Sequence, residues 1–365
     1  MKERIYWLCW QTIMPGSARR IWQLYKAFGS LKAAWEASDK EIQSLVGTNS
    51  RAAEALLKAR SCLDPIREID ELNKIGAEYI TYKDPNYPEN LKSVYDPPPV
   101  LFVLGKILPV DKLAVALVGA RKASSYGLAV AQKLAGELAK VGITVVSGMA
   151  RGIDSASHKG SLLAQGRTVA VLGSGLNVVY PRENRKLLEE ISSSGAVITE
   201  FPLGSKPEAW HFPMRNRVIS GLTRATVVVE AAQKSGALIT ADFALEQGRE
   251  VMAVPGSIGS PLSRGPHQLI KQGAKLVENV QDILEELGIT SLFPEENTHQ
   301  KMKIKLNKSE DSVLKIVTLE PIHFDEIVYK SNLPAQQVLS TLMLLELKGL
   351  IRQLPGRYYA SSEVG

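Results

Sequence analysis

Short apolar runs alternate with amphipathic stretches through the middle of this 365-residue chain. The stretches repeat apolar residues at helical spacing, whereas the runs are almost continuously apolar, as is typical of strands buried on both faces. Seven runs are expected to form strands: Leu113–Val118, Ile143–Ser147, Thr168–Leu172, Ala196–Thr199, Ala225–Glu230, Val251–Val254 and Lys275–Val277. This alternation predicts a doubly wound, mainly parallel α/β domain, which we place at residues 71–290.

Two further apolar runs flank a proline-rich turn region that precedes these strands. Tyr79–Tyr82 and Val100–Leu104 lie on either side of it. Because proline has no backbone N–H to donate to a sheet, we expect both runs to be edge strands.

The first 70 residues follow a helical pattern. Apolar residues recur at helical spacing from Ile21 to Phe28, and Gly29-Ser30 ends this run and caps the next. Short helices joined by tight glycine turns predict a small helical domain over residues 1–70. Helix-hairpin-helix modules that contact nucleic acid share this pattern with many helical caps, and the sequence leaves both alternatives open.

The last third of the chain predicts a polar linker followed by a winged helix. Residues 291–310 are polar and charged, with little apolar periodicity. Residues 311–365 predict three helices and a hairpin: Asp311–Thr318, Phe324–Tyr329, Ala335–Lys348, Leu350–Leu354 and Arg357–Ala360. The third helix would expose few charges and mainly polar side chains, namely Gln336, Gln337, Ser340 and Thr341. This composition favours binding of a partner or regulation over sequence-specific readout of DNA, while Lys330, Arg352 and Arg357 leave room for a contact with the DNA backbone.

Composition places the chain among ordinary globular proteins with a mild basic excess. Hydrophobic residues make up 45% and charged residues 22%, and the net charge is +6. This charge permits binding of nucleic acid without requiring it. Cys9 and Cys62 have neither metal-ligand spacing nor the number needed for a disulfide framework, which indicates a reducing compartment. Because no apolar segment is long enough to span a bilayer, we expect a cytoplasmic protein without a membrane partner.

The most informative motif joins a strand to a helix at residues 147–158. It reads Ser-Gly-Met-Ala-Arg-Gly-Ile-Asp-Ser-Ala-Ser-His, and its loop contains Arg151. Loops of this kind present backbone N–H groups and a positive helix end, and both favour an anion. The loop after the first parallel strand carries Arg121 and Lys122 where a dinucleotide fingerprint would stand, so that fingerprint is absent. A cationic loop in that position suits a phosphate.

Three further loops add groups suited to a single-stranded nucleic acid. Arg182 follows the glycine-rich loop after the third strand, and Ser235-Gly236 begins a helix in a way that favours an anion. Basic residues interleave with aromatic ones in the segment after the fourth strand: Lys206, Trp210, Phe212, Arg215 and Arg217. In such grooves cations follow the phosphate backbone and rings stack on bases. Core packing is the competing interpretation for at least one of the two rings.

No catalytic set, metal site or cofactor site emerges from the sequence. Asp154 and His158 lie one helical turn apart, a spacing that acid–base catalysis could use. The simpler interpretation, which we favour, is that Asp154 caps its helix and His158 packs or forms a hydrogen bond. No histidine has ligand spacing to another histidine or to a cysteine. We therefore expect no metal and no cofactor.

Together these motifs resemble the DNA-processing protein A family (DprA, also called Smf) over nearly the whole chain. The resemblance is carried by Ser147–Asp154 with His158, by Phe212–Arg217, and by Ser235–Ala237 through Pro255-Gly256. It implies an extended Rossmann-like domain with a sterile-alpha-motif-like helical domain before it and a winged helix after it. It also implies binding of single-stranded DNA, loading of the RecA recombinase during natural transformation, and dimers formed through the Rossmann-like domain.

The resemblance also implies positions for the DNA-binding pocket. The arginine after the first strand corresponds to Arg121, and the lysine before the Phe-Pro-x-Arg-Asn-Arg motif to Lys206. Arg182 and the region of Phe212 are further matches. Ala120 and His267 depart from the pattern, since many members have serine and asparagine there.

Two classes of function fit the sequence. One is a non-enzymatic mediator that binds single-stranded DNA. The other is a nucleotide-processing enzyme of the lysine-decarboxylase-like Rossmann group, whose members use Gly-Gly-x-Gly-Thr loops. The corresponding loop here reads Gln233-Lys234-Ser235-Gly236-Ala237 and lacks that pattern. The sequence therefore favours the binding protein.

Overall fold

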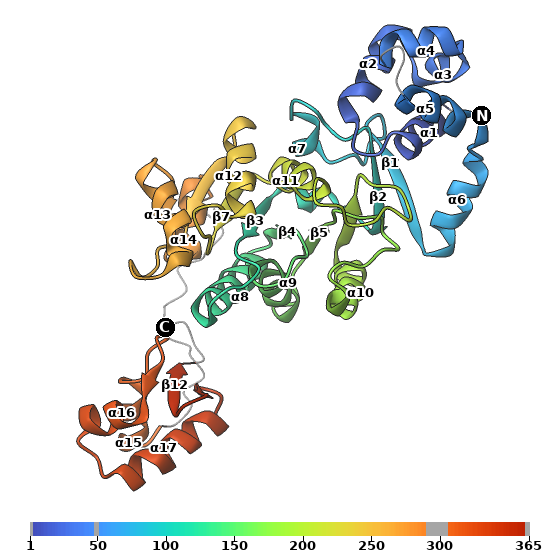
Figure 1. Cartoon of the computed structure of the whole chain (residues 1–365). Coiled ribbons are helices and arrows are strands. Elements are labelled where there is room, and N and C mark those ends of the chain that lie inside the picture. The colour runs from blue at the N-terminus through green and yellow to red at the C-terminus, as the bar shows by residue number, and fades with distance from the viewer. Residues whose placement is uncertain (1–2, 47–50, 290–305, 362–365) are drawn as a thin grey trace.

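A nine-stranded sheet forms the centre of the computed structural model, which describes residues 3–46, 51–289 and 306–361 (Figure 1). Its strands follow the order β1-β2-β6-β5-β4-β3-β7-β8-β9. They are β1 (Ala77–Thr81), β2 (Val100–Gly105), β3 (Ala114–Val118), β4 (Thr144–Ser147), β5 (Thr168–Val171), β6 (Ala196–Thr199), β7 (Ala225–Val228), β8 (Glu250–Ala253) and β9 (Lys275–Leu276). Strands β3 to β9 are parallel to their neighbours within this set. The predicted parallel, doubly wound sheet is confirmed.

One strand expectation is wrong. The run at Val100–Leu104 forms β2, which pairs antiparallel with both β1 and β6 and is buried from Val100 to Val103. Because the prolines lie before β2 and not within it, every N–H that the sheet needs is present. Only β1 of the two strands lies at the edge.

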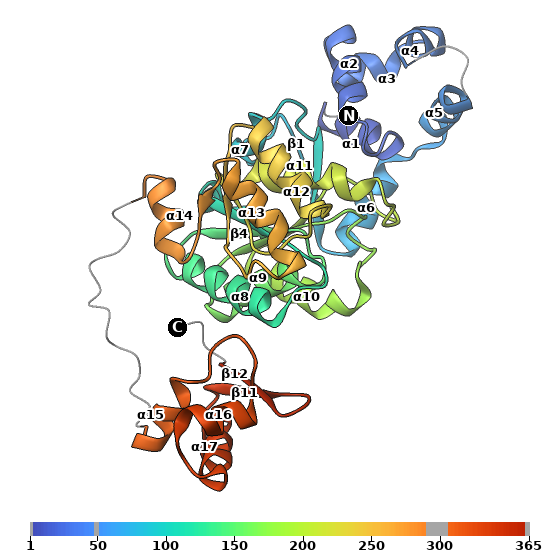
Figure 2. The same ribbon diagram turned by 60° about the vertical axis from the view of Figure 1, so that its left-hand side comes forward.

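Helices cover both faces of the sheet (Figures 1 and 2). One face packs against α8 (Ser125–Lys140), α9 (Ile153–Leu163), α10 (Arg185–Ser194) and α14 (Val280–Glu286). The other packs against α7 (Glu89–Lys92), α11 (His211–Leu222), α12 (Gly236–Glu246) and α13 (Arg264–Lys271). With both faces covered, the continuous apolar runs predicted from the sequence are buried on both sides.

Six short helices precede the sheet and share a core with it. They are α1 (Arg4–Ile13), α2 (Ala18–Phe28), α3 (Leu31–Glu36), α4 (Asp39–Val46), α5 (Arg51–Cys62) and α6 (Pro65–Lys74). Trp7, Trp10 and Leu24 belong to one buried cluster together with Val100 and Phe102 of β2. The helical part is therefore packed against the sheet through this shared cluster.

The C-terminal part is the expected winged helix. It contains α15 (Lys308–Leu314), α16 (Phe324–Ser331), α17 (Ala335–Leu347) and a small sheet of β10 (Ile322–His323), β12 (Tyr358–Ser361) and β11 (Ile351–Leu354). Residues 291–305 of the predicted linker at 291–310 lie outside the described residues. Thr341, expected on the exposed side of α17, is buried, whereas Met343 and Leu347 of this helix are exposed. No helix in the described ranges has the length and apolar character to cross a membrane.

Candidate functional site

Two adjoining hollows open where β3, β4, β5 and β7 reach their carboxyl ends. The larger, about 330 Å³, lies between the loop after β3 and the start of α12, and the smaller, about 170 Å³, between the loops after β4 and β5. Both are lined by Arg121, Lys122, Ala150, Phe212 and Arg215. Because they share these residues, we treat them as one site, the carboxyl-edge groove. Ligands of open α/β sheets usually bind at this edge.

An aromatic ring lies in the middle of the groove with a cation above it. The guanidinium carbon of Arg121 is 5.0 Å from the centroid of the Phe212 ring, and the Tyr180 ring is 5.7 Å from the same centroid. A side chain on Gly173 would place Cβ 3.1 Å from the Phe212 ring, so glycine lets the ring settle against the loop after β5. Arg121 and Lys122 are both exposed. The structure thus combines cations and rings on one surface.

The loop after β4 is held in shape by contacts within the protein. Gly152 has a φ of 74°, and a Cβ there would lie 2.2 Å from the carbonyl oxygen of Ala120. The backbone N–H of Ala150 donates to Asp154, at 3.3 Å, and that of Ile153 donates to the carbonyl of Ala120, at 3.2 Å. These two amides already have partners. The expected anion contact by loop amides is therefore wrong for them.

Arg215 forms the floor of the groove. Its side chain is buried, and Nη1 donates to the carbonyl oxygens of Gly148 and Val171. Burial lowers the pKa of this guanidinium to about 10, a value at which it still carries its charge near neutral pH. Arg215 therefore holds two strand ends together and places a positive charge beneath the groove. The predicted phosphate contact by Arg215, which lines both hollows, stays a prediction beside this positioning role.

Arg217 does not belong to the groove. Only 4% of its side chain is exposed, and Nη2 lies 2.5 Å from Oε2 of Glu200, while Nε lies 3.6 Å from Oδ2 of Asp96. Burial raises the pKa of Glu200, and the charge of Arg217 opposes that rise. The expected DNA contact is wrong for Arg217, because its guanidinium is already paired inside the protein.

The remaining predicted cations surround the groove. Arg151 lines it, is 65% exposed in its side chain and forms an ion pair with Glu183. Arg182 is exposed in the 3-10 turn just after Pro181, a residue that lines the groove. Lys206 is exposed on the loop before α11, which hydrogen-bonds to the loop after β5 through the N–H of Gly175 and the carbonyl of Ser205, at 3.0 Å. Neither Arg182 nor Lys206 lines the groove itself.

The start of α12 completes the groove. Ser235 and Gly236 line it, and Ser235 caps the helix by accepting a hydrogen bond from the N–H of Ala237, at 3.3 Å.

Two groups near the groove were not predicted. Tyr180 is an exposed ring in its lining, and Glu230 accepts hydrogen bonds from the backbone N–H, at 2.9 Å, and the hydroxyl of Ser124 at the start of α8. Because Tyr180 is an aromatic residue shortly after the glycine-rich loop, the sequence could have indicated it as part of the site.

Asp154 and His158 lie beneath the loop after β4. His158 is fully buried, and its Nδ1 lies 2.7 Å from the hydroxyl of Thr168. Burial lowers its pKa to about 3 and raises the pKa of Asp154. The favoured interpretation of His158 is confirmed. Asp154 closes the loop by accepting from Ala150, four residues before it, so the expected helix cap is replaced by a loop contact.

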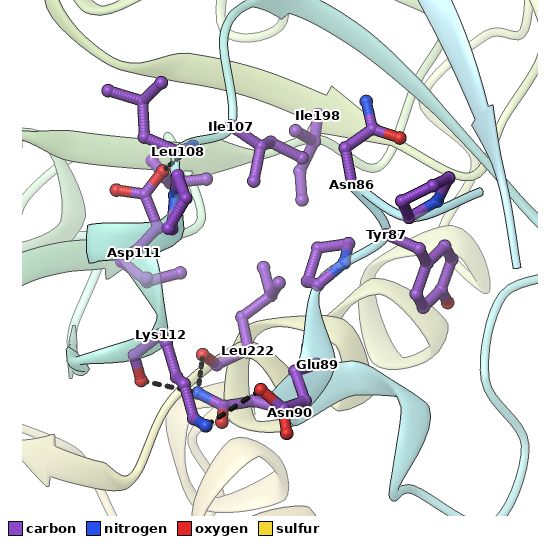
Figure 3. A pocket seen from close by; sticks show the side chains of 15 residues that line it. Asn86, Tyr87, Glu89, Asn90, Ile107, Leu108, Asp111, Lys112, Ile198 and Leu222 are labelled. Carbon is purple, nitrogen blue, oxygen red and sulfur yellow. Dashed lines mark hydrogen bonds and ion pairs between the residues drawn. The ribbon is translucent and has the colours of Figure 1, made fainter.

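A separate cavity of about 260 Å³ is drawn in Figure 3, and none of its lining residues lines the groove. It is lined by the turn at Pro85–Asn90, by residues 107–112 and by apolar side chains such as Ile198 and Leu222. Its polar groups bind one another: Lys112 pairs with Glu89 at 2.8 Å, and Asn90 donates to the carbonyls of Lys112 and Leu222. Residues 107–112 precede β3, so this cavity lies near the amino end of that strand. We therefore centre the candidate site on the carboxyl-edge groove.

These features define a Rossmann-like α/β protein with a cationic groove and an appended winged helix. The model of the family described as DNA recombination-mediator protein A matches residues 78–288, and that of the DprA winged helix domain matches residues 301–357. The chain belongs to the DNA recombination-mediator protein A family. The resemblance inferred from the sequence is thus confirmed.

Relatives and solved structures agree with this assignment. Protein Smf of Synechocystis sp. is 34% identical over 98% of both chains, and DNA processing protein DprA of Bacillus subtilis is 46% identical over 58% of this chain and 72% of its own. The X-ray structure of DNA processing protein A from Streptococcus pneumoniae has a TM-score of 0.67 and 35% identity, covering 78% of this chain and 98% of its own. A structure of DNA processing protein A from Helicobacter pylori, described for the single-stranded DNA binding mode of that protein, has a TM-score of 0.52 and 28% identity, covering 57% and 95%.

Proposed function

We propose that the protein binds single-stranded DNA in the carboxyl-edge groove and acts as a recombination mediator. The observation that carries this proposal is the Phe212 ring in the groove, with Arg121 at 5.0 Å above it. An unpaired base stacks on such a ring, whereas the bases of a duplex are already stacked on each other. The exposed cations Arg121, Lys122 and Arg182 suit the phosphates that accompany that base.

The proposal includes the further steps that the family resemblance implies. The bound strand would be delivered to a RecA recombinase during natural transformation, in the cytoplasm. The protein would act as a homodimer through the Rossmann-like domain at residues 71–290. The helical domain (1–70) and the winged helix (311–365), the latter joined to the Rossmann-like domain through the linker at 291–310, would be separate functional parts. Support for these steps comes from the family match alone.

We propose that the protein is not an enzyme. The two groups that acid–base chemistry would have used, Asp154 and His158, are buried and occupied by internal hydrogen bonds. Incubation with nucleoside monophosphates tests this point by chromatography. Release of free base that disappears in the Asp154→Asn variant would overturn the proposal in favour of a nucleotide-processing enzyme.

Titration of fluorescent oligo-dT at several salt concentrations tests the binding proposal. Each phosphate neutralised on a single strand contributes about −0.7 to the slope of log K against log salt, so Arg121→Ala is expected to weaken binding and flatten the slope by about that amount. Lys140→Ala removes an exposed charge at the far end of α8 and serves as the matched control. A binding constant that does not change with salt refutes the phosphate groove.

A further inference from the structure

A second cationic hollow lies where the N-terminal helices meet the segment between α7 and β2. It encloses about 480 Å³, and none of its lining residues belongs to the carboxyl-edge groove. Helix α2 supplies Arg19, Trp22 and Lys26, and the facing wall supplies Lys92 and Tyr95. We call it the junction hollow. It combines cations with rings in the same way as the groove.

The Tyr95 ring offers an open stacking surface in this hollow. The residue is 86% exposed, and the guanidinium carbon of Arg19 lies 5.3 Å from its ring centroid. The wall beside it is rigid, because Trp22 donates to the carbonyl of Pro97, at 2.8 Å, and contacts the Tyr82 ring edge-on at 4.8 Å. The wall of the hollow is therefore packed before any ligand arrives, which reduces the ordering cost of binding for the Trp22 side of the hollow.

The charge of the junction hollow is positive and largely uncompensated. Among the described residues, Arg19, Lys26 and Lys92 form no ion pair within 4.0 Å. The one acidic residue in the lining is Asp96, which faces the buried guanidinium of Arg217 at 3.6 Å. Three cations around an exposed ring suit a phosphate-bearing strand better than an uncharged ligand.

Helix α11 and the residue before it connect the two sites. Phe212 and Arg215 line the groove, and Arg217 of the same helix pairs with Asp96 of the junction hollow. With a helical rise of about 1.5 Å per residue, Phe212 and Arg217 lie about 8 Å apart along the axis. Trp210, 47% exposed, packs against Gly16 in the turn before α2. An exposed ring at the start of α11 therefore contacts the turn that precedes α2.

We propose that the junction hollow is a second contact site for the single strand held in the carboxyl-edge groove. One base stacks on Tyr95, and the neighbouring phosphates lie at Arg19, Lys26 and Lys92. This inference rests on the proposed function, since it requires a strand in the groove. It assigns to the N-terminal helices a direct part in DNA binding.

The test compares two lengths of oligo-dT by fluorescence anisotropy on the full chain. An oligonucleotide of about 6 nucleotides occupies one site, whereas one of about 30 nucleotides spans both sites. Tyr95→Ala is expected to weaken binding of the long strand about 5-fold or more and to leave the short strand unchanged, because base–ring stacking accounts for such factors. Tyr95→Phe keeps the ring and should bind as the wild type does.

Charge removal gives an independent measurement. The double variant Arg19→Ala/Lys26→Ala should flatten the salt slope of the long strand by about 1.4. Arg20→Ala/Lys40→Ala removes two exposed charges outside the hollow, one from α2 and one from α4, and should have a smaller effect. A photoreactive thymidine within the long strand should crosslink to the peptide that contains Tyr95.

The outcomes separate this inference from the proposed function. If Arg121→Ala weakens both strands while the Tyr95 and Arg19/Lys26 variants bind the long strand as the wild type does, the junction hollow is refuted and the groove stands. If Arg121→Ala changes neither strand, the groove itself is refuted. Loss of long-strand affinity in Arg19→Ala/Lys26→Ala but not in Tyr95→Ala refutes base stacking, and would indicate general attraction of an acidic ligand.

Discussion

The burial of His158 predicts that the protein loses stability in mild acid. The size of this loss can be calculated from the surroundings of the imidazole. The hydroxyl of Thr168 donates its hydrogen to the carbonyl of Val145, at 2.7 Å, so it can only accept from Nδ1 of His158. The imidazole therefore carries its proton on Nδ1, and Nε2 is a buried lone pair without a partner among the described residues. A second proton would place an unpaired N–H and a charge in the core near Arg215.

The sign and size of the effect follow from linkage. The pKa of His158 is about 3 in the folded state and 6.5 as its ordinary value, so the unfolded chain takes up the proton first. Stability is complete above pH 6.5 and falls as the pH drops toward 3. A pH of about 5 lies about 1.5 units below the ordinary pKa of histidine, so protonation stabilises the unfolded state there. The free energy of unfolding is therefore about 2 kcal/mol lower than at about pH 7.5.

Urea unfolding of the wild type and of His158→Gln, at about pH 7.5 and about pH 5, measures this quantity. Carboxylates titrate alike in both proteins, so the difference between the two pH-dependent losses isolates the imidazole. The wild type should lose about 2 kcal/mol more than the variant. Equal losses would refute the buried neutral imidazole, as would a nitrogen NMR spectrum with the proton on Nε2.

Three further predictions concern the groove and its support. Arg217→Met should lower the free energy of unfolding by about 3–5 kcal/mol in urea, because Glu200 is left buried without its partner. Adding Glu200→Gln should restore most of that loss. Additive losses in the double variant would contradict the pairing. Gly148→Ala should lower the unfolding free energy by about 1–3 kcal/mol, since its Cβ would lie 2.5 Å from a guanidinium nitrogen of Arg215. Gly236→Ala has open space around its Cβ and should be nearly neutral in the same assay. Phe212→Ala should weaken oligo-dT binding about 10-fold in anisotropy titrations while Phe212→Tyr binds normally; equal affinity of all three proteins would exclude base stacking.

The architecture was predictable from the sequence because buried parallel strands leave a simple signal. All seven apolar runs between residues 113 and 290 form strands, and β6 begins and ends where expected. The antiparallel place of β2 was not predictable, since strand order depends on contacts between distant segments. The same holds for the core that the N-terminal helices share with the sheet.

The site was partly predictable, and its errors have a geometric cause. Residues 212, 215, 216 and 219 line the groove at the spacing of one helix face. Arg217 lies about 200° around the helix from Arg215, so it points away from that face. Applying helical spacing to the Phe-Pro-x-Arg-Asn-Arg motif would have separated the two arginines. Burial of the Arg215 guanidinium, in contrast, depends on loops that pack over it and is not visible in the motif.

Under the proposed function, Glu230 would give the groove a selectivity that its cations alone would lack. Its carboxylate binds the N–H and hydroxyl of Ser124 at the start of α8, and a Cβ on Gly127 would lie 2.3 Å from Oε2. The protein's own anion thus occupies the helix end where a Rossmann fold ordinarily receives the phosphate of a free nucleotide. A mononucleotide meets a filled position there, whereas a polymer gains attraction from cations spread along its length. Cellular nucleotides should therefore compete poorly with a DNA strand, even at concentrations far above that of the strand.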